Sequence, residues 1–300
     1  MKKKIAIIGL GKYGKKHLSE LRRSDYFELV GVCDKDSSLE EFGRFEFFND
    51  IDSMFSASKP DAVIIATPPK THKEIILKSM RYVKNIFVES PCTESLEQVR
   101  EMKYATSTSN VKVAVGFSQR FNPATFSLLR EFEKEEQIYA MSIIRACPYS
   151  ESLNLVDDLL IKDIDLVRYL LKTEISSFDM KKTVQNSKNS IQCSDDAPSI
   201  IHSSLKTKNG VLVNICSNSF YPEERAYMEI SAKNGVYVAD FVDFNLYKIT
   251  KNGRVNLRVD SEDFSIRHQH RCFAKVCETG EFEEIASIED AVKAREALKL

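Results

Sequence analysis

Residues 4–14 read KIAIIGLGKYG, an apolar run that leads directly into the pattern Gly-x-Gly-x-x-Gly. In such a turn Gly9 permits the change of direction, Gly11 lets a pyrophosphate approach the backbone, and Gly14 lets the next helix pack against the strand. The N-terminus of that helix attracts phosphate groups. A Gly-rich turn alone is a weak signal, because a turn that binds nothing can have the same composition. The stretch predicts a strand, a turn and a helix, with a dinucleotide as the ligand.

The residues that follow support the dinucleotide interpretation. We expect a helix over residues 15–23 and a second strand over residues 27–33, which Asp34 ends about 20 residues beyond Gly14. An acidic side chain at this place can accept hydrogen bonds from the adenosine ribose of NAD, whereas Lys35 beside it suits the 2′-phosphate of NADP. The predicted cofactor is therefore NAD or NADP, with NAD favoured.

The composition limits the possible partners and compartments. A chain of 300 residues with 43% hydrophobic residues can form one large or two ordinary folded domains. A net charge of −1 gives no reason to expect nucleic acid or an anionic membrane as a partner. The opening apolar run is too short for a signal peptide or a membrane span, so we expect a cytoplasmic protein. Seven cysteines without a Cys-x-x-Cys pair indicate neither a zinc site nor a disulfide framework.

The first part of the chain alternates strands and helices. After the second strand, strands are expected over residues 61–66, 85–89 and 111–117, and helices over residues 71–82 and 95–106. Thr71 is a candidate N-cap, and Ser95 opens a capping box. This alternation predicts an α/β fold, with a doubly wound Rossmann sheet in a dinucleotide-binding domain over residues 1–117.

The pattern changes after Phe117, which predicts a second domain over residues 118–300 for substrate binding and oligomerisation. It should be an α+β domain with a large, mostly antiparallel open sheet and helices on one face. Helices are expected over residues 123–135, 157–172 and 288–300, and strands over 138–146, 178–184, 199–206, 211–219, 227–232, 236–241 and 245–250. Asn-Gly pairs at 209–210, 234–235 and 252–253 are typical of hairpin turns. Because an open sheet face is seldom left bare, we expect a homodimer or homotetramer through this sheet.

Several local motifs occur in an order that resembles the Gfo/Idh/MocA family, the glucose–fructose oxidoreductase and inositol dehydrogenase group. The motifs are GLGKYG (9–14), ATPPKTH (66–72), ESP (89–91), GFSQRFNP (116–123), DLLIKDID (158–165) and SIEDA (287–291). The resemblance covers essentially the whole chain. It implies a Rossmann domain and a C-terminal α/β domain whose open sheet often carries the oligomer interface. It also implies nicotinamide-dependent oxidation or reduction of a sugar, cyclitol, sugar nucleotide or related carbonyl compound.

The fingerprint and the resemblance together indicate a set of cofactor-binding residues. They are Gly9, Leu10, Gly11, Lys12, Tyr13, Gly14, Asp34, Lys35, Thr67, Pro68, His72 and Glu89. Thr67 and Pro68 follow a strand at its carboxyl end, where open α/β sheets bind ligands. His72 either contacts the cofactor or is an ordinary histidine at a helix start.

Two departures from the family pattern concern catalysis. The family's Glu-Lys-Pro is Glu89-Ser90-Pro91 here, and its Asp-x-x-x-His is Asp158-x-x-x-Lys162. Lys162, Asp158 and Ser90 are the resulting catalytic candidates. A lysine can do acid–base work only if its pKa falls well below about 10.4, and Asp158 one turn away opposes that fall. Lys162 is therefore a relocated catalytic lysine, a binder of an anionic substrate group, or half of a surface Asp–Lys pair.

The resemblance also indicates substrate-binding residues. They are Arg120, Asn122, Tyr149, Asp158 and Lys162, and Arg145 is a further candidate for lining the cleft. An equally good explanation for Arg120 is that its hydrogen bonds hold the joint between the two domains.

Three histidines have simpler explanations than ligand binding. His17 is expected to pack within the first helix. His268, His270 and Cys272 lie close enough in sequence to suggest a metal site, but we place them on a strand and expect no metal, and the family needs none.

The leading hypothesis is an NAD(P)-dependent oxidoreductase that transfers hydride between nicotinamide and a sugar-like or other small hydroxyl or carbonyl substrate. The alternative is a catalytically inactive nucleotide- or sugar-binding protein with a regulatory or sensor role, because both proton-handling residues of the family pattern are replaced. A third possibility is a reductase whose proton comes from solvent or from the substrate itself.

Overall fold

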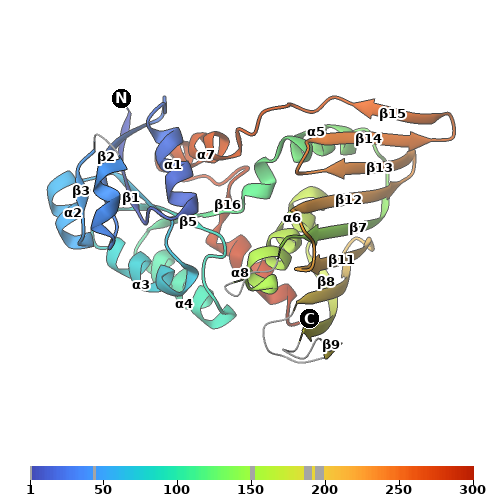
Figure 1. Cartoon of the computed structure of the whole chain (residues 1–300), viewed down its shortest axis with the longest axis horizontal. Coiled ribbons are helices and arrows are strands. Elements are labelled where there is room, and N and C mark those ends of the chain that lie inside the picture. The colour runs from blue at the N-terminus through green and yellow to red at the C-terminus, as the bar shows by residue number, and fades with distance from the viewer. Residues whose placement is uncertain (1, 43–44, 149–152, 186–190, 193–198) are drawn as a thin grey trace. The chain divides into compact units, whose positions relative to one another are not determined.

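The computed structural model describes residues 2–42, 45–148, 153–185, 191–192 and 199–300. The chain divides into two compact units (Figure 1). Unit 1 contains Met1–Ser118 and Ser265–Val292, and unit 2 contains Gln119–Phe264 and Lys293–Leu300. Among the described residues, none of the helices has the length and apolar character needed to span a bilayer.

Unit 1 is built on a seven-stranded sheet in the order β16-β6-β5-β4-β1-β2-β3. The strands are β1 (Lys3–Ile8), β2 (Phe27–Cys33), β3 (Phe47–Phe48), β4 (Ala62–Ile65), β5 (Asn85–Glu89), β6 (Lys112–Gly116) and β16 (Ala286–Ser287). All neighbours pair in parallel except β16, which is antiparallel to β6. The predicted doubly wound Rossmann fold is confirmed, and the strand order reverses at β1, between β4 and β2.

Most helices of unit 1 follow the sequence signals, and α7 is the exception. The helices are α1 (Lys12–Leu21), α2 (Ile51–Ser58), α3 (Pro69–Ser79), α4 (Leu96–Thr108), α7 (Ser265–Thr279) and the first part of α8 (Ile288–Ala297). Ser95 caps α4 by accepting the N–H of Gln98, as predicted. The predicted start of the third helix at Thr71 is wrong: α3 begins at Pro69, whose ring fits the first helical position and needs no hydrogen-bond donor.

Unit 2 is built on a nine-stranded sheet in the order β15-β14-β13-β12-β7-β11-β10-β8-β9. The strands are β7 (Ile138–Ala146), β8 (Ile175–Gln185), β9 (Ile191–Gln192), β10 (Ile200–Thr207), β11 (Leu212–Asn218), β12 (Arg225–Ala232), β13 (Gly235–Asp240), β14 (Asn245–Thr250) and β15 (Gly253–Leu257). Only β7 and β11 pair in parallel. The mostly antiparallel sheet is therefore confirmed.

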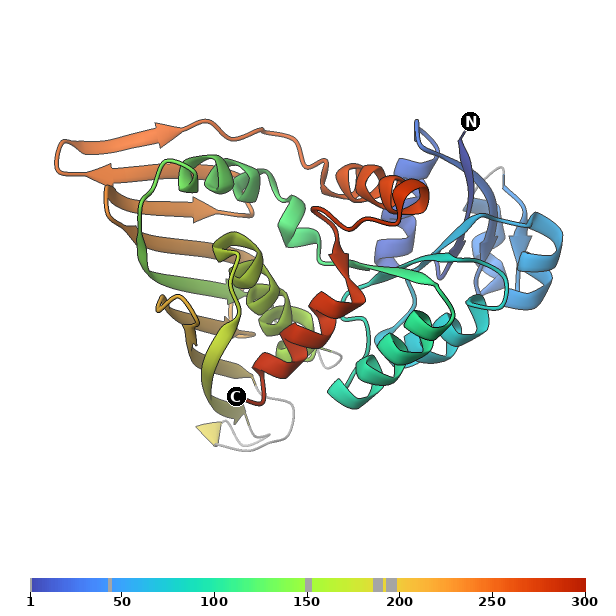
Figure 2. The same ribbon diagram turned by 180° about the vertical axis from the view of Figure 1, so that it is seen from behind.

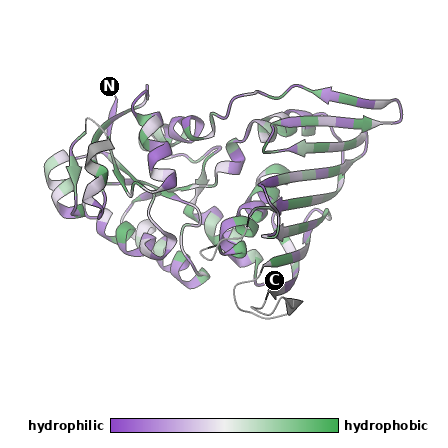
Figure 3. Cartoon of the chain, viewed as in Figure 1, coloured by the Kyte–Doolittle hydropathy of each residue, from purple (hydrophilic) through white to green (hydrophobic). Residues whose placement is uncertain are grey.

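One face of this sheet is buried and the other is exposed. Burial alternates residue by residue along β10 and β11, and Figure 3 shows the corresponding bands of hydropathy. Helices α5 (Pro123–Phe132) and α6 (Ile161–Leu171) lie against one face (Figure 2). The Asn-Gly pairs form the expected hairpin turns, with positive φ at Gly210, Gly235 and Gly253.

The C-terminal region differs from its prediction. Residues 265–292 pack with unit 1, although the sequence placed them in a domain over 118–300. Within them, His268, His270 and Cys272 lie on α7 and not on a strand. The buried residues Gln269, His270, Phe273, Ala274 and Val276 recur at helical spacing, but the polar members of this face hide the apolar period. Among the described residues, no group of three His, Cys, Asp or Glu side chains could hold a metal ion.

Candidate functional site

The Gly-rich turn after β1 has the geometry that a dinucleotide requires. Gly9 has φ +96°, and a Cβ there would lie 2.8 Å from the carbonyl oxygen of Ala66. A Cβ at Gly14 would overlap the carbonyl oxygen of Gly9, whereas a Cβ at Gly11 would meet no atom within 4 Å. Two glycines therefore shape the turn, and the third leaves open space where a pyrophosphate can approach the backbone at the start of α1. The residues present fit a dinucleotide.

Asp34 joins the end of β2 to this turn. Its Oδ2 accepts the backbone N–H of Leu10 at 2.6 Å, and its Oδ1 accepts the N–H of Asp36 at 3.0 Å. The Leu10 side chain is buried, while Lys12, Tyr13 and Lys35 are exposed around it. The structure thus brings the predicted Gly9–Gly14 turn and Asp34 together at one edge of the sheet.

His72 holds together the loops that follow β4 and β5. Its side chain is buried, with Nε2 lying 2.7 Å from the carbonyl oxygen of Thr67 and Nδ1 3.1 Å from that of Pro91 and 3.2 Å from that of Cys92. Burial lowers the pKa of His72, while these carbonyl groups and the charge of Glu89 oppose the change. Both ring nitrogens face backbone, so the histidine positions the loops that carry Thr67, Pro68 and Ser90.

Glu89 ends β5 and belongs to a buried polar cluster. Its Oε1 lies 2.7 Å from Nε2 of His17, and Nδ1 of His17 lies 2.8 Å from Nε2 of His270. The other oxygen, Oε2, accepts the backbone N–H of Ser90 at 3.3 Å. His17 therefore links α1 to β5 and α7 in addition to packing in the first helix. The contact with His270 could not be found from sequence, because 253 positions separate the two histidines.

In unit 2, Asp158 lies within an irregular turn, and Lys162 follows this turn near the start of α6. Residues Val156–Leu160 form a π turn, in which the N–H of Ile161 bonds to the carbonyl oxygen of Val156 five residues earlier. Both side chains are half-buried, and Asp158 accepts the N–H of Asn154 at 2.8 Å. A π turn shifts the register, so the simple four-residue spacing assumed from the sequence does not hold here, although π turns are frequent at functional sites.

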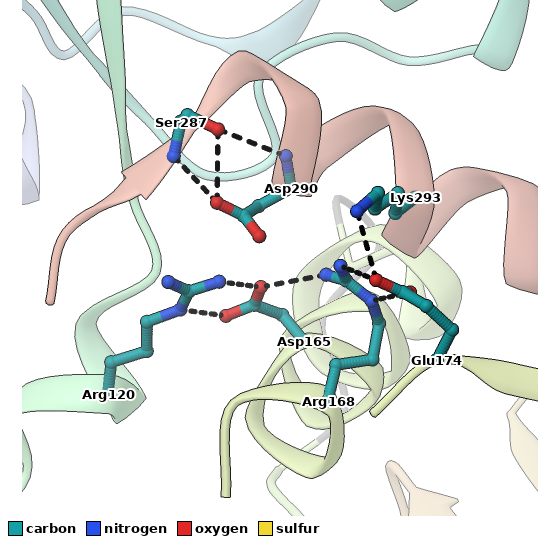
Figure 4. Close-up of polar contacts among 7 residues, drawn as sticks. All are labelled: Arg120, Asp165, Arg168, Glu174, Ser287, Asp290 and Lys293. Atoms are coloured by element: carbon teal, nitrogen blue, oxygen red, sulfur yellow. Dashed lines mark hydrogen bonds and ion pairs between the residues drawn. The ribbon is translucent and has the colours of Figure 1, made fainter. Parts of the chain in front are cut away.

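Arg120 and its neighbours form a chain of ion pairs that the sequence did not reveal (Figure 4). Arg120 makes a two-pronged contact with buried Asp165, at 2.7 Å from Nε and 2.6 Å from Nη2. Arg168 lies 3.6 Å from Asp165 and 2.8 Å from Glu174, which also pairs with Lys293 at 3.1 Å. The signal was present as acidic residues within the apolar run of α6.

The other substrate candidates also have structural partners within unit 2. Arg145 is buried and pairs with Asp163, the second acidic residue that sequence reasoning missed. Asn122 caps α5 by accepting the N–H of Ala124, and its amide donates to the carbonyl oxygen of Phe241 at 2.9 Å. Tyr149 lies outside the described residues.

Comparison with known proteins assigns this geometry to a family. Residues 3–117 match the Gfo/Idh/MocA model, described as an oxidoreductase family with an NAD-binding Rossmann fold. Residues 3–117 therefore carry the NAD-binding Rossmann domain of the Gfo/Idh/MocA family. The match coincides with the sheet of unit 1 that carries the Gly-rich turn, Asp34 and Glu89.

Two curated proteins that are similar to this chain are inositol dehydrogenases. The scyllo-inositol 2-dehydrogenase (NAD(+)) of Bacillus subtilis is 33% identical over 187 residues, which cover 57% of this chain and 55% of that protein. The inositol 2-dehydrogenase of Rhizobium meliloti is 26% identical over 251 residues, covering 79% and 75%. The alignment with the first relative therefore spans about half of its length. These names give no support to the catalytically inactive alternative.

A solved structure shows that the fold extends over the whole chain. The UDP-N-acetylglucosamine 3-dehydrogenase of Acidithiobacillus ferrooxidans superposes with a TM-score of 0.86 and 19% identity, covering 100% of this chain and 96% of that one. At this identity the likeness shows the fold alone.

Proposed function

We propose that this protein is a nicotinamide-dependent oxidoreductase that transfers hydride between the cofactor and a sugar-like or other small hydroxyl or carbonyl compound. The observation that carries the proposal is the Gly9–Gly14 turn with Asp34 hydrogen-bonded to Leu10, at the carboxyl edge of a parallel sheet. The bound cofactor would supply the hydride acceptor or donor. The match of residues 3–117 to an oxidoreductase family and the similarity of the chain to two inositol dehydrogenases support the same activity.

NAD is the proposed cofactor in preference to NADP. The Asp34 carboxylate would accept hydrogen bonds from the adenosine ribose, and it would repel a 2′-phosphate. Exposed Lys35 offers a compensating charge on the next residue. We expect this single lysine to be insufficient, because an exposed cation is well screened by water and salt.

Lys162 is the proposed proton-transfer residue, with Asp158 and Ser90 assisting it. Oxidation of an alcohol needs a group that accepts the hydroxyl proton, and the reverse reaction needs a donor. The sequence resemblance aligns Lys162 with the family's histidine, and the half-buried π turn before it would provide a partly desolvated setting. Arg120 and Asn122 would act by holding the backbone around the substrate, since their side chains are already engaged by Asp165, Ala124 and Phe241.

A second copy of the chain is the proposed partner of the nine-stranded sheet. Ile144, Leu212 and Ile249 are 44%, 56% and 44% exposed, and the strand register places them on one face. Burying such residues stabilises an assembly by the hydrophobic effect. Light scattering coupled to size-exclusion chromatography should give the mass of a dimer or tetramer, and a monomer at micromolar concentration would contradict this part of the proposal.

The activity is tested by following nicotinamide absorbance with a panel of candidate substrates. The panel contains inositols, glucose 6-phosphate and a UDP-sugar, each with NAD and NADP and, for their oxidised forms, with NADH and NADPH. Substrate-dependent turnover that Lys162→Ala abolishes supports the proposal. A protein that binds dinucleotide but turns over none of these compounds would favour a non-catalytic role.

A further inference from the structure

The cluster of Glu89, His17 and His270 places one carboxylate at the end of a chain of imidazole groups. Relative exposure is 7% for Glu89, 0% for His17 and 1% for His270, so none of the three is freely solvated. They come from β5, α1 and α7, three elements of unit 1 that are far apart in sequence. Contacts of 2.7 and 2.8 Å join them in a line.

The hydrogen-bond directions along this line are set by its ends. Burial and the neighbouring His17 lower the pKa of His270 well below its ordinary value, so His270 is neutral near pH 7. An ionised Glu89 can only accept hydrogen bonds, so His17 donates from Nε2 and accepts at Nδ1 from Nε2 of His270. His17 then has one donor and one acceptor in use, His270 donates from Nε2, and the negative charge remains on Glu89.

The surroundings of the cluster are apolar. The ring of Phe87 lies 5.2 Å from that of His17, that of Phe27 lies 6.3 Å from that of His270, and Phe273 packs against both phenylalanines. A Cβ at Gly116 would lie only 3.1 Å from Oε2 of Glu89, so a glycine at the end of β6 leaves room for the carboxylate. A charge enclosed in this way acts over a longer distance than one in water.

The position of Glu89 in the sheet indicates which part of a bound dinucleotide its charge would affect. In our account the adenosine ribose of the dinucleotide lies at Asp34, after β2, and the pyrophosphate lies over β1. Since β4 and β2 flank β1 on opposite sides, the rest of the dinucleotide would extend toward the ends of β4 and β5. Glu89 is the last residue of β5. Its charge is therefore on the nicotinamide side of the nucleotide site, in a chain that has Ser90 where the family has a lysine.

We propose that the Glu89 carboxylate, oriented by His17 and His270, makes the site favour oxidised nicotinamide, whose ring is cationic, over reduced nicotinamide, whose ring is neutral. This inference rests on the proposed function, because it assumes that the Gly9–Gly14 turn binds a nicotinamide dinucleotide. Glu89 is a specificity-determining residue in this account, and His17 and His270 are positioning residues.

The test measures the dissociation constants of NAD⁺ and NADH by calorimetry, with no substrate present. Glu89→Gln keeps the size and the accepting oxygen but removes the charge, and it should weaken NAD⁺ binding about three- to thirtyfold relative to NADH. Glu94→Gln, which removes an exposed carboxylate, is the matched control and should leave the ratio unchanged. An unchanged ratio in a folded Glu89→Gln protein would overturn the inference.

A further measurement keeps the test independent of that variant. Nitrogen NMR of the histidine rings without ligand should show His17 protonated at Nε2 and not at Nδ1 at pH 8; the opposite tautomer would contradict the orienting role.

The variants of His17 separate its two contacts. In His17→Gln the side-chain amide places an N–H near the position of Nε2, so this variant should preserve the preference for NAD⁺. In His17→Asn the shorter amide extends only to the position of Nδ1, so this variant should reduce the preference. Failure of the folded protein to bind either dinucleotide would contradict both this inference and the proposed function. Binding of both forms with a ratio insensitive to Glu89 would contradict the inference alone.

Discussion

The carboxylate of Asp34 accepts the backbone N–H of Leu10 at 2.6 Å, which joins the end of β2 to the middle of the Gly-rich turn. A hydrogen bond to a charged group contributes more than a neutral one, so this contact helps to hold the turn in its binding conformation. Asp34 therefore has two tasks in our account: it shapes the turn, and it recognises the ribose.

Asp34→Ala should weaken NADH binding by about tenfold or more, because it removes a charge-assisted hydrogen bond as well as the ribose acceptor. Lys35→Ala should leave NADH binding unchanged and lower any residual affinity for NADPH. Calorimetric titration of both variants with NADH and with NADPH measures these affinities. Equal losses for NADH in the two variants would show that Asp34 has no special part in the site.

The glycines of the turn provide a matched pair of substitutions. Gly11→Ala should fold normally, since φ at Gly11 is −66° and its Cβ would meet open space, but it should obstruct the pyrophosphate and lose dinucleotide affinity. Gly14→Ala should lower the free energy of unfolding by about 1–3 kcal/mol or more, because its Cβ overlaps the backbone of Gly9. Thermal melting and titration together distinguish these outcomes.

Lys162→Ala should abolish turnover while changing NADH affinity by less than about twofold, because Lys162 lies outside the unit that carries the Gly-rich turn. Lys208→Ala removes an exposed lysine of the same unit and should retain full turnover. A normal kcat in Lys162→Ala would mean that another group or the solvent transfers the proton.

The Arg120–Asp165 pair should be important for stability. Both side chains are almost fully buried, so Asp165→Leu or Arg120→Met should lower the free energy of unfolding by about 3–5 kcal/mol. The double variant Arg120→Met, Asp165→Leu should recover much of this loss, because it leaves no buried charge without its partner. Urea unfolding of the three variants measures the coupling, and strictly additive losses would contradict it.

Acid should remove the stabilisation that comes from Glu174. Its hydrogen bond with Arg168 and its ion pair with Lys293 lower the pKa of Glu174 from its ordinary 4.5. The contribution is thus fully present above pH 4.5 and is lost as the pH falls through the lower folded-state value. Glu174→Gln should be less stable than the parent at pH 7, with a difference that shrinks near pH 3. A difference independent of pH would contradict the assignment.

Local signals in the sequence were sufficient for most of the fold. The Gly-rich turn, the buried strand Ala62–Ile65 and the Asn-Gly hairpins each depend on residues close together in the chain, so their geometry can be predicted. Helix α7 was missed because histidine and glutamine occupy its buried face beside Phe273.

The partners of the candidate site were harder to predict. His17 meets Glu89 and His270 only after the sheet and α7 have assembled, and no local pattern encodes contacts between such distant positions. The π turn before Lys162 is likewise invisible to an argument that assumes regular helical spacing. Asp163 and Asp165 were overlooked because charged residues are usually exposed, and these two are buried only through their arginine partners.

The most direct test of the account is a calorimetric titration of nucleotide-free protein with NADH and, separately, with NADPH. Absorbance of the starting sample shows whether any nucleotide has been carried through purification. The account predicts saturable binding of NADH, with clearly weaker binding of NADPH because of Asp34. A folded, nucleotide-free protein that binds neither would contradict the dinucleotide assignment of the Gly9–Gly14 turn, and the proposed oxidoreductase activity would fail with it.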